Sequence, residues 1–384
     1  MNNKTINDTK TKKPNKKLKI IILSILLLLV ITAVAVVVYT IAFHEPDNQI
    51  DETKPFDVID SPDGNNSSVG SGKNEFNFLF LGKDRTGANT DVMMIINYNV
   101  KDGDISVLQI PRDTYVELDN RSYKINSLYS KYLSEAKKNK ESSPENYSLS
   151  KVAKTLEKNL CINIHYYSMI NLDGFRNIVD ILGGIEVDIP QDMYCHDDTK
   201  DEYFTLKKGK HLLDGQQAEL FVRFRSGYIQ ADIGRMNAQK IFMSALIKTV
   251  KENFTISKIV KMTSEIYKNL TTDLPLDDMI YFAKNMFSID MEKINFMSMP
   301  GEAVYSGLSY YVMNRKATMN IIQNYFNIYS DVVIDDTIFD PNRVFSSKYN
   351  SAISERYNKE PSQNQGNSQS AEDINDSSIH IPRK

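Results

Sequence analysis

An uncharged apolar run at residues 20–43 constrains this chain of 384 residues more than any other feature. As a helix rising about 1.5 Å per residue it would be about 36 Å long, enough to cross a bilayer with some tilt. Seven lysines precede the run against a single acidic residue, Asp8, and four acidic residues follow it within residues 45–52. The positive-inside rule therefore predicts a cytoplasmic N-terminus and an extracellular domain after the run.

A cleaved signal peptide is the alternative interpretation of the same run. Its apolar core would be shorter and would end at a cleavage site with two small residues flanking a third. Residues 38–41 read Val-Tyr-Thr-Ile, which is a poor site of that kind. The sequence thus favours an uncleaved, single-pass anchor in the cell membrane.

The rest of the chain divides by composition. A basic cytoplasmic tail is expected at residues 1–19, and an extracellular linker rich in Pro, Gly, Ser and Asn at residues 44–75. A folded domain is expected at residues 76–344, and a disordered polar tail at residues 345–384. Hydrophobic residues make up 41% of the chain, enough for a sizeable core. The formal net charge of −3 gives no support to a nucleic-acid partner.

Strand and helix patterns alternate through the folded domain. Apolar strands are expected at residues 76–81, 92–98 and 105–110, with a hairpin turn at Asp102-Gly103, and further strands near 164–170 and 185–189. Helical patterns occupy residues 124–137, 149–160, 172–182, 214–222, 233–251, 255–269, 276–288 and 314–329. This alternation predicts an α/β fold, a three-layer α/β/α domain with a central mixed β-sheet.

Three charged residues should meet at one rim of that sheet. Asp84 lies just past the first strand, and Asp91 lies at the start of the second strand across a short loop. The third strand ends at Pro111-Arg112, and the turn at Asp102-Gly103 returns its end to the same edge. The strand order alone therefore brings Asp84, Asp91 and Arg112 together.

A second charged group follows about a hundred residues later. If residues 222–225 are extended, Arg223 and Arg225 share one face while Phe224 enters the core. Further along, Asp232, Arg235 and Gln239 have the i, i+3, i+7 spacing of one helical stripe. The stripe lies in the first turns of its helix, where backbone amides and the helix dipole favour an anion.

Aspartates beside several arginines suit one chemistry. Carboxylates bind Mg²⁺, and guanidinium groups bind phosphate oxygens in pairs. Taken singly, each of these charges is more often part of a surface ion pair. Taken together, two guanidinium groups about 6 Å apart repel by roughly 3 kcal/mol at an effective dielectric of about 20. Converging arginines therefore call for an anion among them.

The segments that carry these residues resemble the LytR-CpsA-Psr family, the cell-wall glycopolymer ligases of Gram-positive bacteria. The likeness runs in motif order over residues 76–252. The matching segments are Asn77–Asp84, Thr90–Met94, Ile110–Asp113, Lys124–Asn126, Asn171–Phe175, Leu182–Gly184, Leu213–Gly215, Val222–Arg225 and Asp232–Arg235.

The resemblance implies a Mg²⁺-dependent phosphotransferase. Family members take a glycopolymer such as teichoic acid or capsule from an undecaprenyl-pyrophosphate carrier and attach it to a peptidoglycan hydroxyl, releasing lipid phosphate. The residues that the resemblance assigns to binding the metal ion are Asp84 and Asp91, and those assigned to the pyrophosphate are Arg85, Arg112, Arg223, Arg225, Asp232, Arg235 and Gln239. Within the second set, Asp232 and Gln239 would orient the arginines. Asp84 is also the first candidate for a general base.

Two positions depart from the family pattern. Asn89 stands where many members have an arginine, a charge that Arg85 could supply from the other side of the loop, and Ala238 stands where the family has a second helix arginine. Two other functions stay open from the residues: a non-catalytic envelope regulator, and a polyprenyl-pyrophosphate phosphatase or carrier. Cys161 and Cys195 match no metal or redox spacing, and whether they pair is left open.

Overall fold

The computed structural model describes residues 45–46, 74–87, 89–119, 121–197, 201–224, 231–306, 308–326, 338–340, 356–359 and 369–370. Within these ranges the side chains of residues 197, 202, 231–235, 305–306 and 369–370 are not described. The chain divides into two compact units, Met1–Pro46 and Asp47–Lys384, and every element below belongs to the second. The predicted anchor at residues 20–43 lies outside the described residues. Within the described ranges, no helix has both the length and the apolar character that a bilayer crossing requires.

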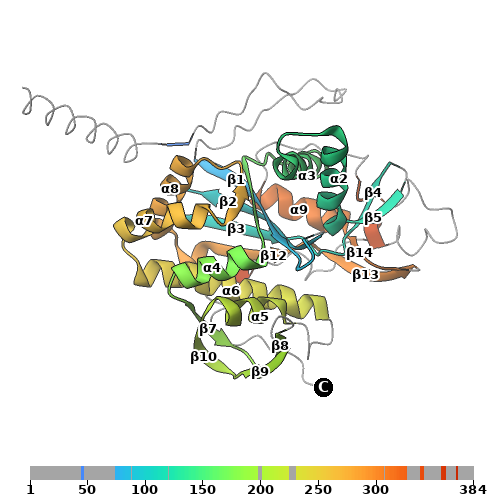
Figure 1. Cartoon of the computed structure of the whole chain (residues 1–384). Helices are drawn as coiled ribbons and strands as arrows, with labels where there is room; N and C mark the ends of the chain where they lie inside the picture. The colour runs from blue at the N-terminus through green and yellow to red at the C-terminus, as the bar shows by residue number, and fades with distance from the viewer. Residues whose placement is uncertain are drawn as a thin grey trace, which may run out of the picture. The chain divides into compact units, whose positions relative to one another are not determined.

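A seven-stranded mixed sheet forms the centre of the domain (Figure 1). Neighbouring pairs are parallel at β1–β6 and β3–β12 and antiparallel at the other four contacts. The strand order is β11 (Leu270–Thr272), β6 (Tyr166–Ile170), β1 (Glu75–Lys83), β2 (Thr90–Asn99), β3 (Asp104–Gln109), β12 (Ile294–Ser298) and β15 (Gln369–Ser370).

Strands β1, β2 and β3 form the predicted antiparallel meander. Gly103 makes the turn between β2 and β3 with a φ of +72°, and its N–H donates to the Asn99 carbonyl at 2.9 Å. A Cβ atom at Gly103 would lie 2.6 Å from the carbonyl oxygen of Ser288, so both the backbone angle and the neighbouring segment require glycine here. The reversal returns the end of β3 to the edge where β1 ends.

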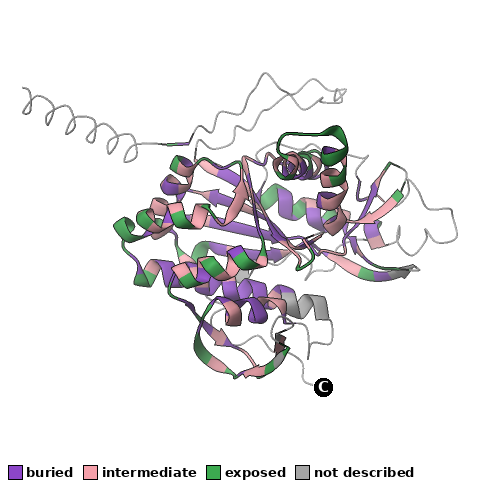
Figure 2. Cartoon of the chain, in the orientation of Figure 1, coloured by how far each residue is buried: buried purple, intermediate pink, exposed green. Residues whose placement is uncertain are grey.

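Helices cover both faces of the sheet, as the three-layer prediction requires (Figure 1). One face packs against α2 (Leu128–Asn139), α3 (Pro144–Leu160) and α9 (Arg315–Tyr325). The other packs against α4 (Leu172–Ile181), α5 (Gly215–Arg223), α6 (Ala231–Asn253), α7 (Ile256–Tyr267) and α8 (Leu276–Asn285). Figure 2 shows the buried residues running through the sheet between these layers.

Packing on both faces of β1 explains why its sequence is apolar without alternation. Leu79 and Leu81 are fully buried in the core cluster shared with α2, α3 and α9. Phe78 and Phe80 point the other way and pack against the cluster shared with α4 to α8. A strand covered on both faces has no solvent side, so each side chain contributes to a core.

Four two-stranded sheets surround the central sheet, and of their strands only β7 was predicted. The other strands of these pairs are short and show no strong hydrophobic periodicity. The sequence therefore did not distinguish them from loops. The pairs are β4 (Tyr115–Leu118) with β5 (Arg121–Lys124), β7 (Ile185–Ile189) with β10 (Gly209–Leu213), β8 (Met193–Asp197) with β9 (Glu202–Leu206), and β13 (Gly301–Ser306) with β14 (Leu308–Met313). Three short 3-10 helices complete the described elements: η1 (Ile125–Ser127), η2 (Met286–Ser288) and η3 (Met291–Lys293).

Part of the stretch predicted as a disordered tail packs on the domain. Tyr357 is buried in the core cluster next to α9, and β15 pairs with β12. The prediction does not fit these residues, because an aromatic ring and backbone pairing hold them against the domain. Cys161 and Cys195 do not form a disulfide with each other, and Cys195 is buried.

Candidate functional site

Asp91 and Arg112, which the strand order predicts at one rim of the sheet, form an ion pair there. Arg112 Nη1 donates to Asp91 Oδ1 at 2.7 Å, and both side chains are about a quarter exposed (25% and 21%). Gly82 pairs with Val92 while Lys83 pairs with Thr90, so the ladder is irregular at Asp91. A bulge of this kind turns a side chain away from its regular direction, and here it occurs at the residue that meets Arg112.

Asp84 lies at the end of β1 and organises the loop that leads to β2. Thr86 Oγ1 donates to the two carboxylate oxygens of Asp84 at 2.9 and 3.0 Å, and the Asn89 N–H donates to Oδ1 at 3.3 Å. The Asp84 N–H donates in turn to the Asn89 carbonyl at 2.9 Å. These bonds close the loop, so that Asp84 and Asp91 lie at the same end of the β1–β2 pair.

The two aspartates have the ligand chemistry of a magnesium site. Mg²⁺ prefers hard oxygen ligands, keeps several waters and is commonly bound by one or two carboxylates together with substrate phosphates. In the described part of the chain, no cluster of three or more His, Cys, Asp or Glu side chains could hold a metal ion. A Mg²⁺ ion held by Asp84 and Asp91 would be of that kind, with water and phosphate oxygens among its other ligands.

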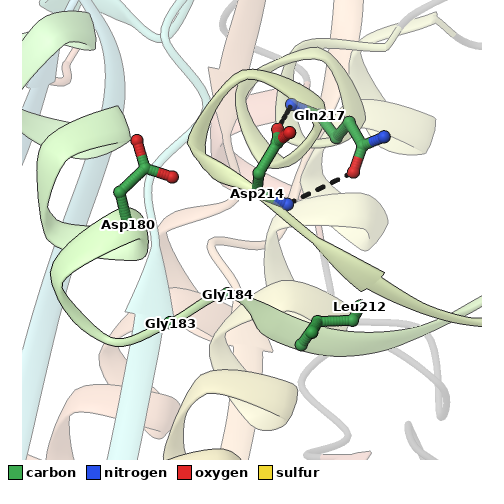
Figure 3. A pocket seen from close by; sticks show the side chains of 6 residues that line it. All are labelled: Asp180, Gly183, Gly184, Leu212, Asp214 and Gln217. Atoms are coloured by element: carbon green, nitrogen blue, oxygen red, sulfur yellow. Dashed lines mark hydrogen bonds between the residues drawn. The ribbon is translucent and has the colours of Figure 1, made fainter.

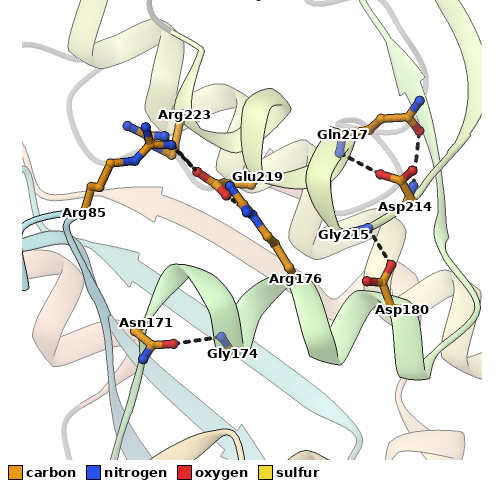
Figure 4. A network of polar contacts seen from close by, with 10 residues as sticks. All are labelled: Arg85, Asn171, Gly174, Arg176, Asp180, Asp214, Gly215, Gln217, Glu219 and Arg223. Atoms are coloured by element: carbon orange, nitrogen blue, oxygen red, sulfur yellow. Dashed lines mark hydrogen bonds and ion pairs between the residues drawn. The ribbon is translucent and has the colours of Figure 1, made fainter. Parts of the chain in front are cut away.

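Three arginines converge on one buried carboxylate, Glu219 of α5 (Figure 4). Arg223 Nη1 donates to Glu219 Oε1 at 2.8 Å, and Arg85 Nη2 lies 3.3 Å from the same oxygen. Arg176 of α4 donates through Nε to Glu219 Oε2. The Glu219 side chain is 0% exposed, whereas those of Arg85, Arg176 and Arg223 are 32%, 24% and 29% exposed. We call these four residues the Glu219 cluster.

Arg223 reaches this cluster from a helix, which corrects the predicted extended segment. It is the last residue of α5, and the chain becomes extended only at Phe224, whose ψ is 128°. The i, i+4 ion pair with Glu219 favours the helical geometry up to Arg223. The predicted burial of Phe224 is confirmed at 8% exposure, while Arg225 lies outside the described residues.

Helix α6 carries the predicted stripe, and the structure locates one of its three side chains. Gln239 is 6% exposed, accepts a hydrogen bond from Gln109 of β3, and donates to the Val222 carbonyl at 3.4 Å. It thus links α6 to the sheet and to the end of α5. The side chains of Asp232 and Arg235 are not described, although both residues lie in the first turns of α6 as predicted. Ala238 is fully buried, so this position cannot present a charge to a ligand.

Sequence reasoning did not find Glu219, Arg176 or Gln109. The one available indication was Glu219 itself, a charged residue within an otherwise apolar stretch of α5 between Ala218 and Leu220. A carboxylate on the buried face of a helix predicts cationic partners, because burying it unpaired is costly. Nothing in the sequence identified those partners.

A separate pocket of about 250 Å³ opens where α4 ends and α5 begins (Figure 3). It is lined by Asp180, Gly183, Gly184, Leu212, Asp214 and Gln217. Its carboxylates serve the fold, because Asp214 accepts from the Gln217 N–H at 2.8 Å as a helix cap and Asp180 accepts from the Gly215 N–H at 2.8 Å. This pocket therefore helps to join α4 to α5 and is distinct from the candidate site.

Comparison with known proteins agrees with the sequence motifs. A model of the LytR_cpsA_psr family matches residues 34–327. The chain belongs to the LytR_cpsA_psr family. It is 29% identical over 255 residues to the polyisoprenyl-teichoic acid–peptidoglycan teichoic acid transferase TagV of Bacillus subtilis, over 63% of this chain. That match spans 61% of TagV, less than two thirds of its length.

Further relatives extend the comparison. TagU of Bacillus cereus (strain AH820), which carries the same transferase name, is 30% identical over 269 residues, 67% of this chain and 82% of TagU. The crystal structure of B. subtilis TagV matches with a TM-score of 0.55 at 27% identity, over 66% of this chain and 98% of that one. The protein gbs0355 of Streptococcus agalactiae matches with a TM-score of 0.54 at 21% identity, over 69% and 91%, and shows the fold alone. The LytR_cpsA_psr chain described here thus shares the family's α/β domain.

Proposed function

We propose that this LytR_cpsA_psr chain transfers a glycopolymer from a polyprenyl-pyrophosphate carrier to a hydroxyl group of peptidoglycan. Its relatives TagV and TagU are named as transferases of teichoic acid from a polyisoprenyl carrier to peptidoglycan, and a polymer of the teichoic-acid or capsule class fits the same reaction here. The observation that carries the proposal is the group of charges at the end of β1. The loop there holds both Asp84 and Arg85, and Arg85 and Arg223 contact the same carboxylate oxygen of Glu219.

The residues of the site have separate tasks in this proposal. Arg112, Arg85 and Arg223 bind the phosphate oxygens, since guanidinium groups match phosphate geometry with paired N–H donors. Arg225, Asp232 and Arg235 remain predicted members of the same group; Arg225 lies outside the described residues, and the side chains of Asp232 and Arg235 are not described. Gln239 holds α6 against the sheet from the interior.

The proposed transfer is a single displacement at phosphorus. The acceptor oxygen bonds to the sugar-linked phosphorus, the bond to the bridging oxygen breaks, and lipid monophosphate leaves with that electron pair. The arginines offset the charge that develops on the transferring and leaving oxygens, which is the main task of a protein in phosphoryl transfer. Asp84 is the candidate to accept the proton of the hydroxyl group. Mg²⁺ bound by Asp84 and Asp91 would supply further positive charge at the same oxygens.

The expected topology suits this reaction. A single-pass anchor with the domain outside the cell would keep the site beside the membrane that carries the lipid substrate and facing the peptidoglycan that accepts the polymer. A purely regulatory role needs no such arrangement of arginines. A phosphatase would use the same residues but would deliver the phosphate to water.

Replacing Arg223 with alanine tests the proposal in cells. We expect polymer attached to peptidoglycan to fall about 10-fold or more, because a charged hydrogen bond to phosphate is lost from the site. The measurement is the polymer content of purified peptidoglycan in a strain without redundant homologues, complemented with either chain at equal abundance. Attachment equal to that of the unaltered chain would contradict the proposal.

A further inference from the structure

Two buried glutamines connect three segments that carry charged residues of the proposed site. Gln109, at the end of β3, donates through Nε2 to Oε1 of Gln239 in α6. Gln239 donates through its own Nε2 to the Val222 carbonyl, near the end of α5, at 3.4 Å. Both glutamines are almost excluded from solvent, at 3% and 6% exposure. We call this chain of two hydrogen bonds, from Gln109 through Gln239 to the Val222 carbonyl, the glutamine relay.

The direction of the glutamine relay is fixed by its last member. A backbone carbonyl can only accept a hydrogen bond, so the Gln239 amide must turn its NH₂ group toward Val222. The oxygen of the same amide then faces Gln109, which must present its own NH₂ group. The Val222 carbonyl is among the last four of α5, which have no partner within the helix, so the relay also satisfies one of these acceptors. An apolar side chain at position 109 could not complete the relay.

Each member of the relay lies close in the chain to a charged residue of the proposed site. Gln109 is three residues before Arg112, and Val222 comes directly before Arg223. The third member, Gln239, belongs to the predicted stripe in the first turns of α6. The relay therefore joins β3, α5 and α6 through the interior, next to the residues that these segments contribute to the site.

The starting point of the relay is held in the middle of the central sheet. Gln109 pairs with Met94 of β2 on one side and with Ser298 of β12 on the other. Its carbonyl accepts from the Met299 N–H at 2.9 Å. A side chain on such a strand is placed more precisely than one on a loop. The sheet can therefore act as the reference that sets the positions of α6 and of the end of α5.

Packing alone does not account for a glutamine at position 109. The bond to Gln239 leaves Oε1 of Gln109 buried and, within the part of the chain that the structure describes, without a hydrogen-bond partner. An unpaired buried acceptor lowers stability, whereas methionine would fill a similar volume with no such group. A polar residue that burdens the core in this way is typical of a functional arrangement.

We propose that Gln109 is a positioning residue for pyrophosphate binding, which acts through Gln239 to hold the end of β3, the end of α5 and the start of α6 at a fixed spacing. The inference rests on the proposed function, because pyrophosphate is the ligand of the arginines on these segments. A pyrophosphate has two phosphate groups, and arginines from separate segments can contact both at once only at the right spacing. Displacements of about 1 Å weaken such contacts, because paired N–H donors demand geometry as well as charge.

The test measures, by calorimetry, the binding of farnesyl pyrophosphate with Mg²⁺ to the full chain and its variants in detergent micelles. We expect Gln109→Met to raise the Kd about 10-fold with an unchanged number of sites per chain, because a buried hydrogen bond no longer ties α6 to β3. A purely structural role predicts the opposite pattern, with fewer binding-competent chains and an unchanged Kd. Gln239→Met and the double variant complete a cycle, in which the double variant should bind no more weakly than Gln239→Met alone.

Asn97→Leu is the matched control for the loss of a buried amide bond. Asn97 of β2 is buried and donates through Nδ2 to Asn77 Oδ1 of β1 at 2.9 Å, so this variant also replaces an amide by an apolar side chain of similar size. The pair lies toward the end of the β1–β2 ladder opposite to Asp84 and Asp91. We expect the Kd of the control to stay unchanged, even where its thermal unfolding temperature falls as far as that of Gln109→Met.

The outcomes separate this inference from the proposed function. Failure of the unaltered chain to bind farnesyl pyrophosphate would overturn both. A normal Kd for Gln109→Met, in a chain whose unaltered form binds, would overturn the inference alone, as would an equal rise in the control. Additive effects of the two glutamine variants would overturn the connection through Gln239. If Gln109→Met does not fold, Gln109→Asn decides in its place, because it keeps an amide but shortens the side chain by one methylene group.

Discussion

Replacing Arg112 with alanine is expected to lower the rate of polymer transfer by about 100- to 1000-fold, the usual effect of removing one preorganised group that stabilises developing charge. Two losses combine in this variant. The phosphate loses a guanidinium group, and Asp91 loses the partner that lies 2.7 Å from its carboxylate. An Asp91 carboxylate without that partner would also repel the anionic substrate. The measurement is transfer of a labelled, lipid-linked polymer to peptidoglycan by the purified full chain with Mg²⁺.

Arg121→Ala is the matched control for this experiment. Arg121 is an exposed arginine on β5, so its loss removes the same charge from the surface of the same domain without touching the rim of the sheet. We expect its transfer rate to equal that of the unaltered chain. If Arg112→Ala transferred polymer at a rate within about threefold of the control, Arg112 would not belong to the catalytic residues.

Gly215→Ala is expected to destabilise the domain by about 1–3 kcal/mol, the range for forcing an extra methyl group into a packed site. The added Cβ would lie 2.4 Å from a backbone oxygen of α4, and backbone yields less readily than the end of a flexible side chain. Alanine gains at most about 1 kcal/mol in helix propensity at such a position. Separating α4 from α5 would also move Arg176 away from Glu219. Urea unfolding followed by circular dichroism measures the free-energy change.

Glu186→Ala is the control for the packing argument. Glu186 is an exposed residue of β7, so its truncation should change the free energy of unfolding by no more than about 0.5 kcal/mol. If Gly215→Ala were as stable as this control, the close approach of α5 to α4 would not be a constraint on the fold.

The rim of the sheet could be predicted because its geometry follows from local sequence. Between Asp84 and Arg112 the chain consists of strands joined by short connections. The turn at Gly103 reverses the chain with a positive φ, which favours glycine. The contact between Asp91 and Arg112 then needs no knowledge of distant packing. The same is true of the helical stripe that includes Gln239, although its burial was not foreseen.

The Glu219 cluster could not be predicted because its contacts depend on how helices pack. Arg176 and Glu219 belong to helices separated by strands β7 to β10, and their contact depends on the angle and distance between α4 and α5. Sequence periodicity fixes which face of a helix is apolar but not which residue of another helix lies opposite. The extended geometry predicted for Arg223 failed for a related reason, since the ion pair with Glu219 favours one more helical residue.

In the proposed function, this site transfers a glycopolymer from lipid pyrophosphate to peptidoglycan. The most direct measurement is the product balance of the purified full chain supplied with lipid-linked polymer, peptidoglycan and Mg²⁺. We expect polyprenyl monophosphate and peptidoglycan-attached polymer to appear in a one-to-one ratio, with both dependent on the acceptor. Release of polymer phosphate into water without an attached product would contradict the claim, as would the absence of either product.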